Sequence, residues 1–253
     1  MDVYGPERRS GLVSQERTEA VVLRGVDFSE TSRIVTFLTP DRGKVACMAA
    51  GARRPKSNLS GVLDVFNRLE IVYYWKDGRS VQRLAEASVL ETYPAIKADL
   101  ERSVCAAFPL EIVYKAAQEN EPSEQLYSTL VRGLTSLTQW TGDSRTHTAW
   151  QALQLMSSAG FEVTLAPRGT REWVWFSYEH GVLSPAQRGD RRLNALEYDG
   201  LCALAAHPES CPDIEGITAV FAAVRGYVER HLEAGFRSVR VIDQVFDRTR
   251  RQV

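Results

Sequence analysis

Residues 69–89 read LEIVYYWKDGRSVQRLAEASV, and this stretch decides the fold of the amino-terminal part of the chain. Leu69, Ile71 and Tyr73 fall on one face and Glu70, Val72 and Tyr74 on the other, which is the period-2 pattern of a β-strand. Lys76-Asp77-Gly78-Arg79 follows, and Asp-Gly is a strong hairpin signal because that turn needs a positive φ. Residues 80–89 then continue as a second strand. The stretch therefore predicts an antiparallel β-hairpin.

Further segments of strand length precede this hairpin, at Thr18–Arg24, Ser32–Thr39 and Gly43–Ala50. Five strands within about 75 residues are typical of a small Greek-key barrel of the OB type, and closure of the barrel removes exposed strand edges. We therefore expect an OB-type five-stranded β-barrel over residues 17–93. Residues 1–16 are polar and contain Gly5, Pro6 and Gly11, so they are expected to form a flexible amino-terminal tail.

After Pro94 the spacing of apolar residues changes to that of helices. The stripes are Ile96, Leu100, Val104 and Phe108; Leu126 to Leu137 after Pro122-Ser123; Trp150, Leu153 and Met156 before Gly160; and Ile217 to Val228. Trp173–Phe176 and Val182-Leu183 instead predict a short β-hairpin, inserted at about residues 167–192. The expected architecture is α+β with two domains, the barrel and an α-helical domain over residues 94–253 that carries this hairpin.

The composition, 44% hydrophobic and 25% charged, is that of a globular and not a disordered protein. The formal net charge of −1 excludes a surface that is positive all over, so a nucleic-acid site has to be a local patch. The amino terminus has no apolar segment of signal-peptide length, and no stretch approaches a membrane span. We expect a cytoplasmic protein that does not contact membranes.

Common enzyme motifs are absent from the sequence, which has no P-loop, no GxGxxG after a strand, no HExxH and no GxSxG. We therefore expect a protein that is not an enzyme and holds no metal or cofactor. A nuclease with carboxylates around Asp27, Asp41 and Asp64 stays open as an alternative. The four cysteines form no CxxC pair and are expected to be reduced and partly buried; they are Cys47, Cys105, Cys202 and Cys211. The four histidines are expected to be structural or on the surface; they are His147, His180, His207 and His231.

Basic residues are concentrated in residues 42–56, a window without an acidic residue. Some flank the third expected strand and the others lie in a connection, residues 51–61, that contains Gly, Pro and Ser. Mobile cations on a firm base, with small residues that let the backbone approach, suit phosphate binding. A neighbouring-strand arginine and an aromatic ring for base stacking complete the predicted nucleic-acid site, which consists of Arg33, Arg42, Lys44, Arg53, Arg54, Lys56 and Tyr74. A solvated loop is the alternative, and a solvated terminus is expected for Arg248, Arg250 and Arg251.

Several segments resemble the RecO family of bacterial recombination mediators. They are TEAVVL (18–23), DFSETSRIV (27–35), LTP with RGK (38–44), AGARRPKS (50–57), ETYP (91–94) and FRSVRVI (236–242). The resemblance covers the chain from Thr18 onward. It is specific in the amino-terminal part and only general in the helical middle.

The resemblance implies a DNA repair and recombination protein that binds single- and double-stranded DNA and anneals complementary strands. It also implies action with RecR in the RecF pathway, where the RecA recombinase is loaded onto DNA coated by single-strand-binding protein. The acidic-apolar carboxy-terminal tail of that protein is expected to bind the helical domain. A monomer in the bacterial cytoplasm, associated with the nucleoid, is implied as well. An adaptor of the same pathway with weak or no DNA binding is the alternative, because the net charge is −1.

The chain departs from the many family members that carry four zinc-binding cysteines in the helical domain. In the matching region, Ser184 and Gln187 stand about where one cysteine pair would be, and no cysteine precedes Trp173. We therefore expect no zinc at this place. Trp173, Trp175 and Phe176 are expected to replace the metal as a hydrophobic staple.

Overall fold

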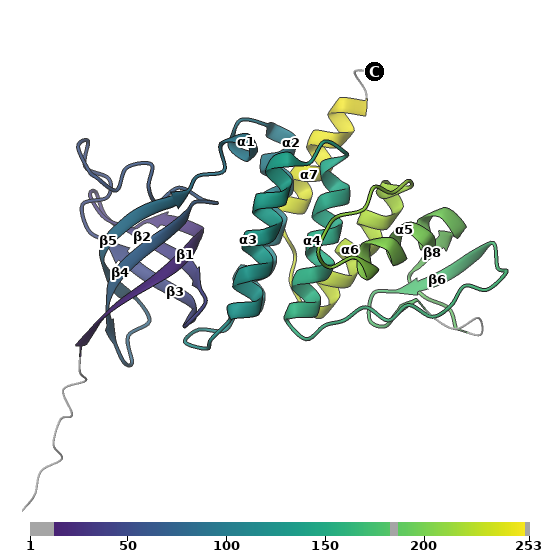
Figure 1. The fold of residues 1–253 in the computed structure, drawn as a ribbon, viewed down its shortest axis with the longest axis horizontal. Coiled ribbons are helices and arrows are strands. Elements are labelled where there is room, and N and C mark those ends of the chain that lie inside the picture. Colours follow the sequence, from purple (N-terminus) through teal and green to yellow (C-terminus); the bar gives the residue numbers. More distant parts are fainter. Residues whose placement is uncertain (1–12, 183–186, 251–253) are drawn as a thin grey trace, which may run out of the picture.

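The computed structural model describes residues 13–182 and 187–250, in which a β-barrel lies beside a group of helices (Figure 1). The strands of the barrel are β1 (Val13–Asp27), β2 (Arg33–Thr39), β3 (Gly43–Ala49), β4 (Arg68–Lys76) and β5 (Gln82–Glu91). Strand β1 pairs with both β2 and β4, and β3 pairs in parallel with β5, so the strands form a ring in the order β1-β2-β3-β5-β4. The expected α+β fold with an OB-type amino-terminal part is confirmed.

Strand β1 can serve two neighbours because it is long and interrupted by a bulge between Val22 and Arg24. Its first part pairs with β4 and its last part with β2. The strand begins at Val13, so residues 13–16 belong to the barrel and not to the expected tail. Residues 1–12 of that tail lie outside the described residues. Residues 13–16 are mostly polar, so the sequence did not indicate a strand here. In the structure they pair with residues 73–76 of β4.

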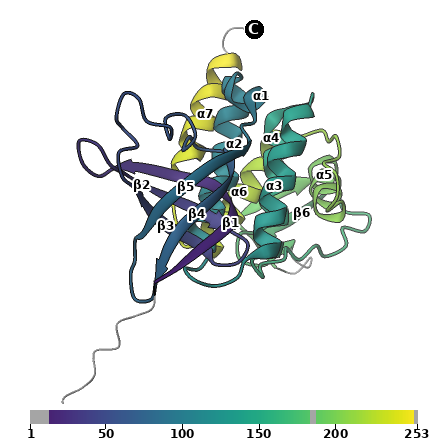
Figure 2. The same ribbon diagram turned by 60° about the vertical axis from the view of Figure 1, so that its left-hand side comes forward.

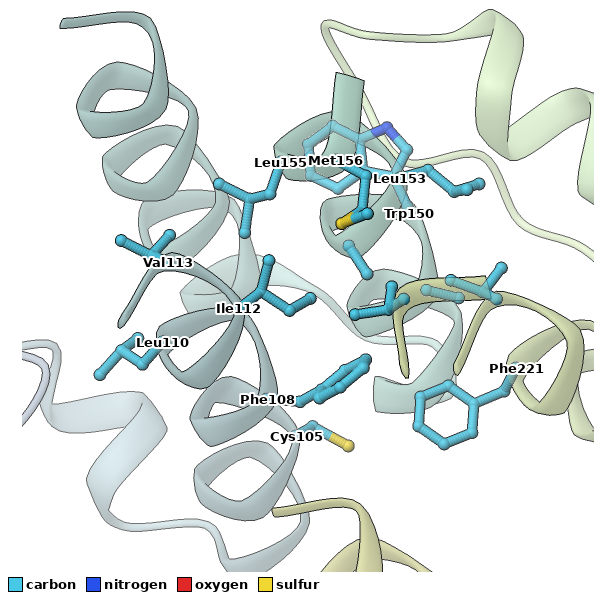
Figure 3. Close-up of a cluster of buried hydrophobic side chains, with 14 of the residues drawn as sticks. Cys105, Phe108, Leu110, Ile112, Val113, Trp150, Leu153, Leu155, Met156 and Phe221 are labelled. Carbon is cyan, nitrogen blue, oxygen red and sulfur yellow. The ribbon is translucent and has the colours of Figure 1, made fainter. Parts of the chain in front are cut away.

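The helices are α1 (Pro94–Lys97), α2 (Leu100–Ala116), α3 (Glu124–Gln139), α4 (Ser144–Ser158), α5 (Ala195–Ala206), α6 (Ile217–His231) and α7 (Arg237–Arg250). Helix α4 lies at the centre and packs against α2, α3 and α6, with Phe108, Trp150 and Phe221 in the shared core (Figure 3). Val21 and Leu38 of the barrel belong to the same core. None of the helices in the described ranges is long and apolar enough to cross a bilayer.

The first expected helical stripe spans two helices, α1 and α2, because the helix is interrupted between them. Asp99 is extended, with φ −116° and ψ 122°, and its side chain accepts a hydrogen bond from the backbone of Arg102, so it caps a new helix, α2. Leu100 at the start of α2 is 67% exposed and does not belong to the core. The expected end of the third stripe is confirmed, because Gly160 follows α4 with φ 89°.

The expected hairpin is present as an antiparallel pair of strands, and a third strand extends it to a small sheet. Strand β6 (Trp173–Ser177) lies between β7 (Gly181–Val182) and β8 (Arg191–Asn194). The sequence did not indicate β8, because a four-residue strand is too short to show a period. Phe176 of β6 is buried against Tyr227, whereas Trp173 and Trp175 lie on the opposite face. Phe176 is thus packed into the helical core, whereas the two tryptophans contact each other on the outer face. That these three residues replace a metal as a staple stays a hypothesis.

Candidate nucleic-acid interface

The basic connection, residues 51–61, lies at one end of the barrel beside the β1–β2 loop, residues 28–32 (upper left in Figure 2). The backbone N–H of Arg53 donates to the carbonyl of Thr31 at 3.1 Å, which joins the two loops. Leu59 and Leu63 are packed against or buried in the barrel core. The connection is therefore anchored at its side and at its end. We call residues 28–32 and 51–61 together the loop surface.

The three cations of the loop surface differ in their contacts. Arg53 donates to the carbonyl of Ser29 at 2.7 Å, and its Nε is 3.3 Å from a carboxylate oxygen of Asp27. Arg54 and Lys56 are exposed, and neither forms an ion pair within the part of the chain that the structure describes. Since an exposed ion pair contributes little, Arg53 can exchange Asp27 for a phosphate. The loop surface thus offers three cations to an anion.

Arg33 lies at the same end of the barrel and approaches the same carboxylate. Its Nε is 3.8 Å from Asp27. The guanidinium lies over Gly25, where an added Cβ would be 2.6 Å from Nε, so only glycine leaves room for it. The Asp27 carboxylate thus lies between the side chains of Arg33 and Arg53. The structure brings Arg33 and Arg53 to the same carboxylate, but Arg33 is half-buried whereas Arg53 is exposed.

Arg42 lies in the β2–β3 turn, at the other end of these strands. It donates two hydrogen bonds to Glu16, at 2.5 and 3.1 Å, and its guanidinium is 4.4 Å from the ring centre of Trp75. The bonds to the Glu16 carboxylate raise the pKa of Arg42. Tyr73 donates to the same carboxylate at 3.0 Å. Arg42 is therefore committed to contacts within the barrel.

Lys44 joins the barrel to the helices. Its ammonium donates to the carbonyl of Tyr114 at 3.0 Å and lies 5.1 Å from the ring centre of the same residue. Its backbone N–H donates to the carbonyl of Gln118 at 3.0 Å. The expectation that both ends of β3 present free cations is therefore corrected. One end docks on the chain that follows α2, and only the loop surface at the other end leaves cations free.

Aromatic rings near the predicted site lie in two places. Tyr74 is 39% exposed on β4, and the guanidinium of Arg83 on β5 lies 5.9 Å from its ring centre. It belongs to the strand face and not to the loop surface. Phe28, which the sequence reasoning missed, is 63% exposed within the loop surface, beside the Ser29 carbonyl that accepts from Arg53. The sequence could have indicated it, because Phe28 is an aromatic residue in the polar segment DFSETS, which follows neither the strand nor the helix pattern of buried residues.

The carboxylates of the nuclease alternative have separate contacts. Asp27 pairs with Arg33 and Arg53, Asp41 accepts a hydrogen bond from Thr18 at 2.7 Å, and Asp64 raises the pKa of nearby Lys97 against the larger, lowering effect of burial. Across residues 13–182 and 187–250, no group of three or more His, Cys, Asp or Glu side chains could hold a metal ion. Among the described residues, these three carboxylates therefore do not form one cluster.

The remaining titratable residues have structural roles or fall outside the described part. All four cysteines are free thiols, as expected. His147 is fully buried beside Ser136, and burial lowers its pKa to about 4. Gln187 is exposed, whereas Ser184 lies outside the described residues. Helix α7 extends to Arg250, but the side chains of the basic carboxy-terminal end are also outside them.

Comparison with known proteins adds to this geometry. Models of the recombination protein O N-terminal and C-terminal regions match residues 13–93 and 97–169. Proteins named DNA repair protein RecO are similar to the chain. The one from Salinibacter ruber is 33% identical over 173 residues, which are 68% of this chain and 65% of that protein. The one from Anaeromyxobacter dehalogenans is 33% identical over 125 residues, 49% of each.

The matched part thus spans about half to two thirds of those two relatives. The protein from Bifidobacterium adolescentis is 28% identical over 242 residues, which are 89% of this chain and 98% of that protein. The two family models follow the barrel and the first helices without overlap and together cover more than half of the chain. The chain belongs to the RecO family of DNA repair and recombination proteins.

Proposed function

We propose that this protein binds single- and double-stranded DNA through the loop surface and anneals complementary strands there. The observation that carries the proposal is the pair of exposed cations, Arg54 and Lys56, that have no ion pair within the described residues. Each cation that neutralises a phosphate releases counterions from the nucleic acid, and this release drives binding without reading sequence. Arg53 is a third cation of the same surface.

Annealing requires that the repulsion between two phosphate backbones is screened while the bases stay available for pairing. The loop surface suits this task because its cations lie on short connections anchored to a barrel, and Phe28 offers a ring on which a base can stack. Tyr74 with Arg83 offers a further ring on the strand face.

A second role, as an adaptor, is supported by a groove between the barrel and the helices. Its volume is about 520 Å³, and it combines apolar walls with cations. Leu23 and Leu110 are among the apolar residues, and Arg24, Lys115 and Arg237 are the basic ones. The lining also contains one carboxylate, that of Glu111, which accepts hydrogen bonds from the backbone and the hydroxyl of Ser238. This combination suits a peptide with both acidic and apolar residues. We propose that the tail of single-strand-binding protein docks here, and that the protein acts with RecR to help RecA replace single-strand-binding protein on DNA.

The test is annealing of complementary oligonucleotides, bare and coated with single-strand-binding protein, as a function of salt. The test variant combines Arg54→Glu with Lys56→Glu, and Arg53 is kept because it holds the two loops together. The control combines Arg132→Glu with Arg230→Glu, which makes the same change of charge on exposed parts of the helical domain. We expect the test variant to lose annealing of bare strands and the control to retain it.

Unchanged annealing by the test variant would remove the loop surface from the mechanism. If the wild-type protein binds the tail of single-strand-binding protein but no DNA at low salt, it is an adaptor and not an annealing protein.

A further inference from the structure

The small sheet β6–β8 has one face buried against the helices and one face turned to solvent. Val174, Phe176 and Leu193 are at most 1% exposed and point toward the helices. Because side chains alternate along a strand, Trp173 and Trp175 of β6 point the other way. Arg192 of β8 lies opposite Trp175 in the register. Two indole rings are thus presented on the outer face of the sheet, which stands at the far end of the molecule from the barrel (Figure 1).

Two arginines lie against these rings. The guanidinium of Arg192 is 3.8 Å from the ring centre of Trp173, and that of Arg188 is 5.5 Å from the ring centre of Trp175. The two indoles contact each other edge to face, with centres 5.7 Å apart. We call Trp173, Trp175, Arg188 and Arg192 the sheet face. Such stacks hold the guanidinium planes in fixed positions and add stability to a sheet without metal ligands.

The charges of the sheet face are not neutralised by neighbouring acids. Arg188 and Arg192 are exposed, and neither forms an ion pair with any residue that the structure describes. Of the nearby acids, Asp190 accepts a hydrogen bond from the backbone of Tyr178, and Glu179 pairs with Arg230. Glu172 is an exposed acid beside Trp173. The face keeps two free cations beside a tryptophan that is 38% exposed.

We propose that the sheet face is a second binding surface for single-stranded nucleic acid. Aromatic rings and guanidinium planes stack with any base, and the same arginines bind phosphates, so this combination takes a single strand without regard to its sequence. A peptide of acidic residues alone would use the two arginines and leave the tryptophans unused, whereas the phosphates and bases of a single strand use both, so we favour nucleic acid. The inference rests on the proposed function and extends it.

A second site would allow one protein chain to bind two nucleic-acid strands at the same time. The loop surface and the sheet face belong to opposite ends of the molecule, so a strand on one does not occupy the other (Figure 1). Two strands held by one protein meet at a raised effective concentration, which is what annealing of dilute strands requires.

The first experiment counts the strands bound per chain, with oligothymidylate of about eight nucleotides, within the size range of one small site. We expect two per wild-type chain, one for Arg188→Gln with Arg192→Gln, one for Arg54→Glu with Lys56→Glu, and none for all four substitutions together. The control, Arg132→Gln with Arg230→Gln, should bind two. In the background of Arg54→Glu with Lys56→Glu, which we call the loop variant, Arg188→Gln alone or Arg192→Gln alone should lower the log–log salt slope by about 0.7, the loss of one phosphate contact.

The outcomes separate this inference from the proposed function. If the wild type binds one strand and the loop variant none, the proposed function stands and the sheet face is not a site. If the wild type binds no strand, the proposed function fails and the inference fails with it. If the sheet face captures oligoglutamate but no oligothymidylate, its partner is an acidic protein, and the inference is overturned.

The second experiment uses the indoles themselves. Of the five tryptophans, Trp75 and Trp150 are buried and Trp140 is half-buried in the helical bundle, with its indole N–H donated to the Asp143 carbonyl, so a base that quenches tryptophan emission acts chiefly on the sheet face. We expect oligothymidylate to quench the emission of the loop variant, and Trp173→Phe to remove most of this quenching while keeping an aromatic ring in the sheet. Trp140→Phe, in the helical bundle, should not remove it. Equal quenching with and without Trp173 would overturn the proposal.

Discussion

Lys44 and Lys56 allow a decisive comparison, because both were predicted to bind DNA and the structure gives them opposite surroundings. Lys44 is half-buried, and its ammonium bonds to the Tyr114 carbonyl in the last turn of α2 and lies over the Tyr114 ring. Lys56 is exposed and has no ion pair within the described residues. We substitute each by methionine, which keeps an unbranched apolar chain of similar length and removes the charge.

The structure sets the size of each effect. Lys44→Met loses one hydrogen bond from a charged group and one cation–π contact, so it should lower the free energy of unfolding by about 2 kcal/mol. It also leaves a carbonyl at the end of α2 without its cation. Lys56→Met should change the free energy of unfolding by less than about 0.5 kcal/mol. It loses one phosphate contact, which lowers the salt slope by about 0.7 and the affinity about fivefold at about 0.1 M salt.

Two measurements on each variant test this reasoning. Unfolding in urea, followed by circular dichroism, gives the stability, and the anisotropy of labelled oligothymidylate from about 0.05 to about 0.4 M salt gives the slope. Lys44→Met should change only the stability, and Lys56→Met should change only the salt slope. A lower slope with unchanged stability for Lys44→Met would refute the assignment of Lys44 to the contact between barrel and helices. A wild-type slope for Lys56→Met would show that it contacts no phosphate.

Three further predictions concern stability and metal content. Burial lowers the pKa of His147 from 6.5 to about 4, so the unfolded state takes up a proton between these values as the pH falls, and the folded state does not. The free energy of unfolding should therefore fall by about 3 kcal/mol between about pH 7 and about pH 4. The stability of wild type relative to His147→Gln should fall by the same amount, and a constant difference would contradict the lowered pKa. Gly43→Ala should destabilise by about 2 kcal/mol or more, because φ is 59° and a Cβ would lie 2.4 Å from the Glu121 carbonyl, whereas Gly78→Ala, with φ 74° and open space, should cost about 1 kcal/mol in urea unfolding. Metal analysis of the purified protein should find far less than one zinc per chain, and a full equivalent would show that other ligands replace the missing cysteines.

Local patterns predicted the elements that build the fold. The alternation in residues 69–89 and the Asp77-Gly78 turn correspond to β4, β5 and a turn with Gly78 at φ 74°. The helical stripes correspond to α3, α4 and α6. The first stripe corresponds to α1 and α2 and not to one helix, because a single capping residue, Asp99, interrupts the helix without changing the spacing of the apolar residues. Strand β8 was missed because it is too short to show a period.

The sequence by itself determined that cations gather around the third strand of the barrel, because charge and turn residues are properties of a local segment. Only the tertiary structure decided which of them are free. Arg42 meets Glu16, 26 residues away, and Lys44 meets the carbonyl of Tyr114, 70 residues away. Arg54 and Lys56 meet no such partner within the described residues. Partners so distant along the chain are chosen by the packing of the barrel against the helices, and no spacing of residues within the basic segment contains that information.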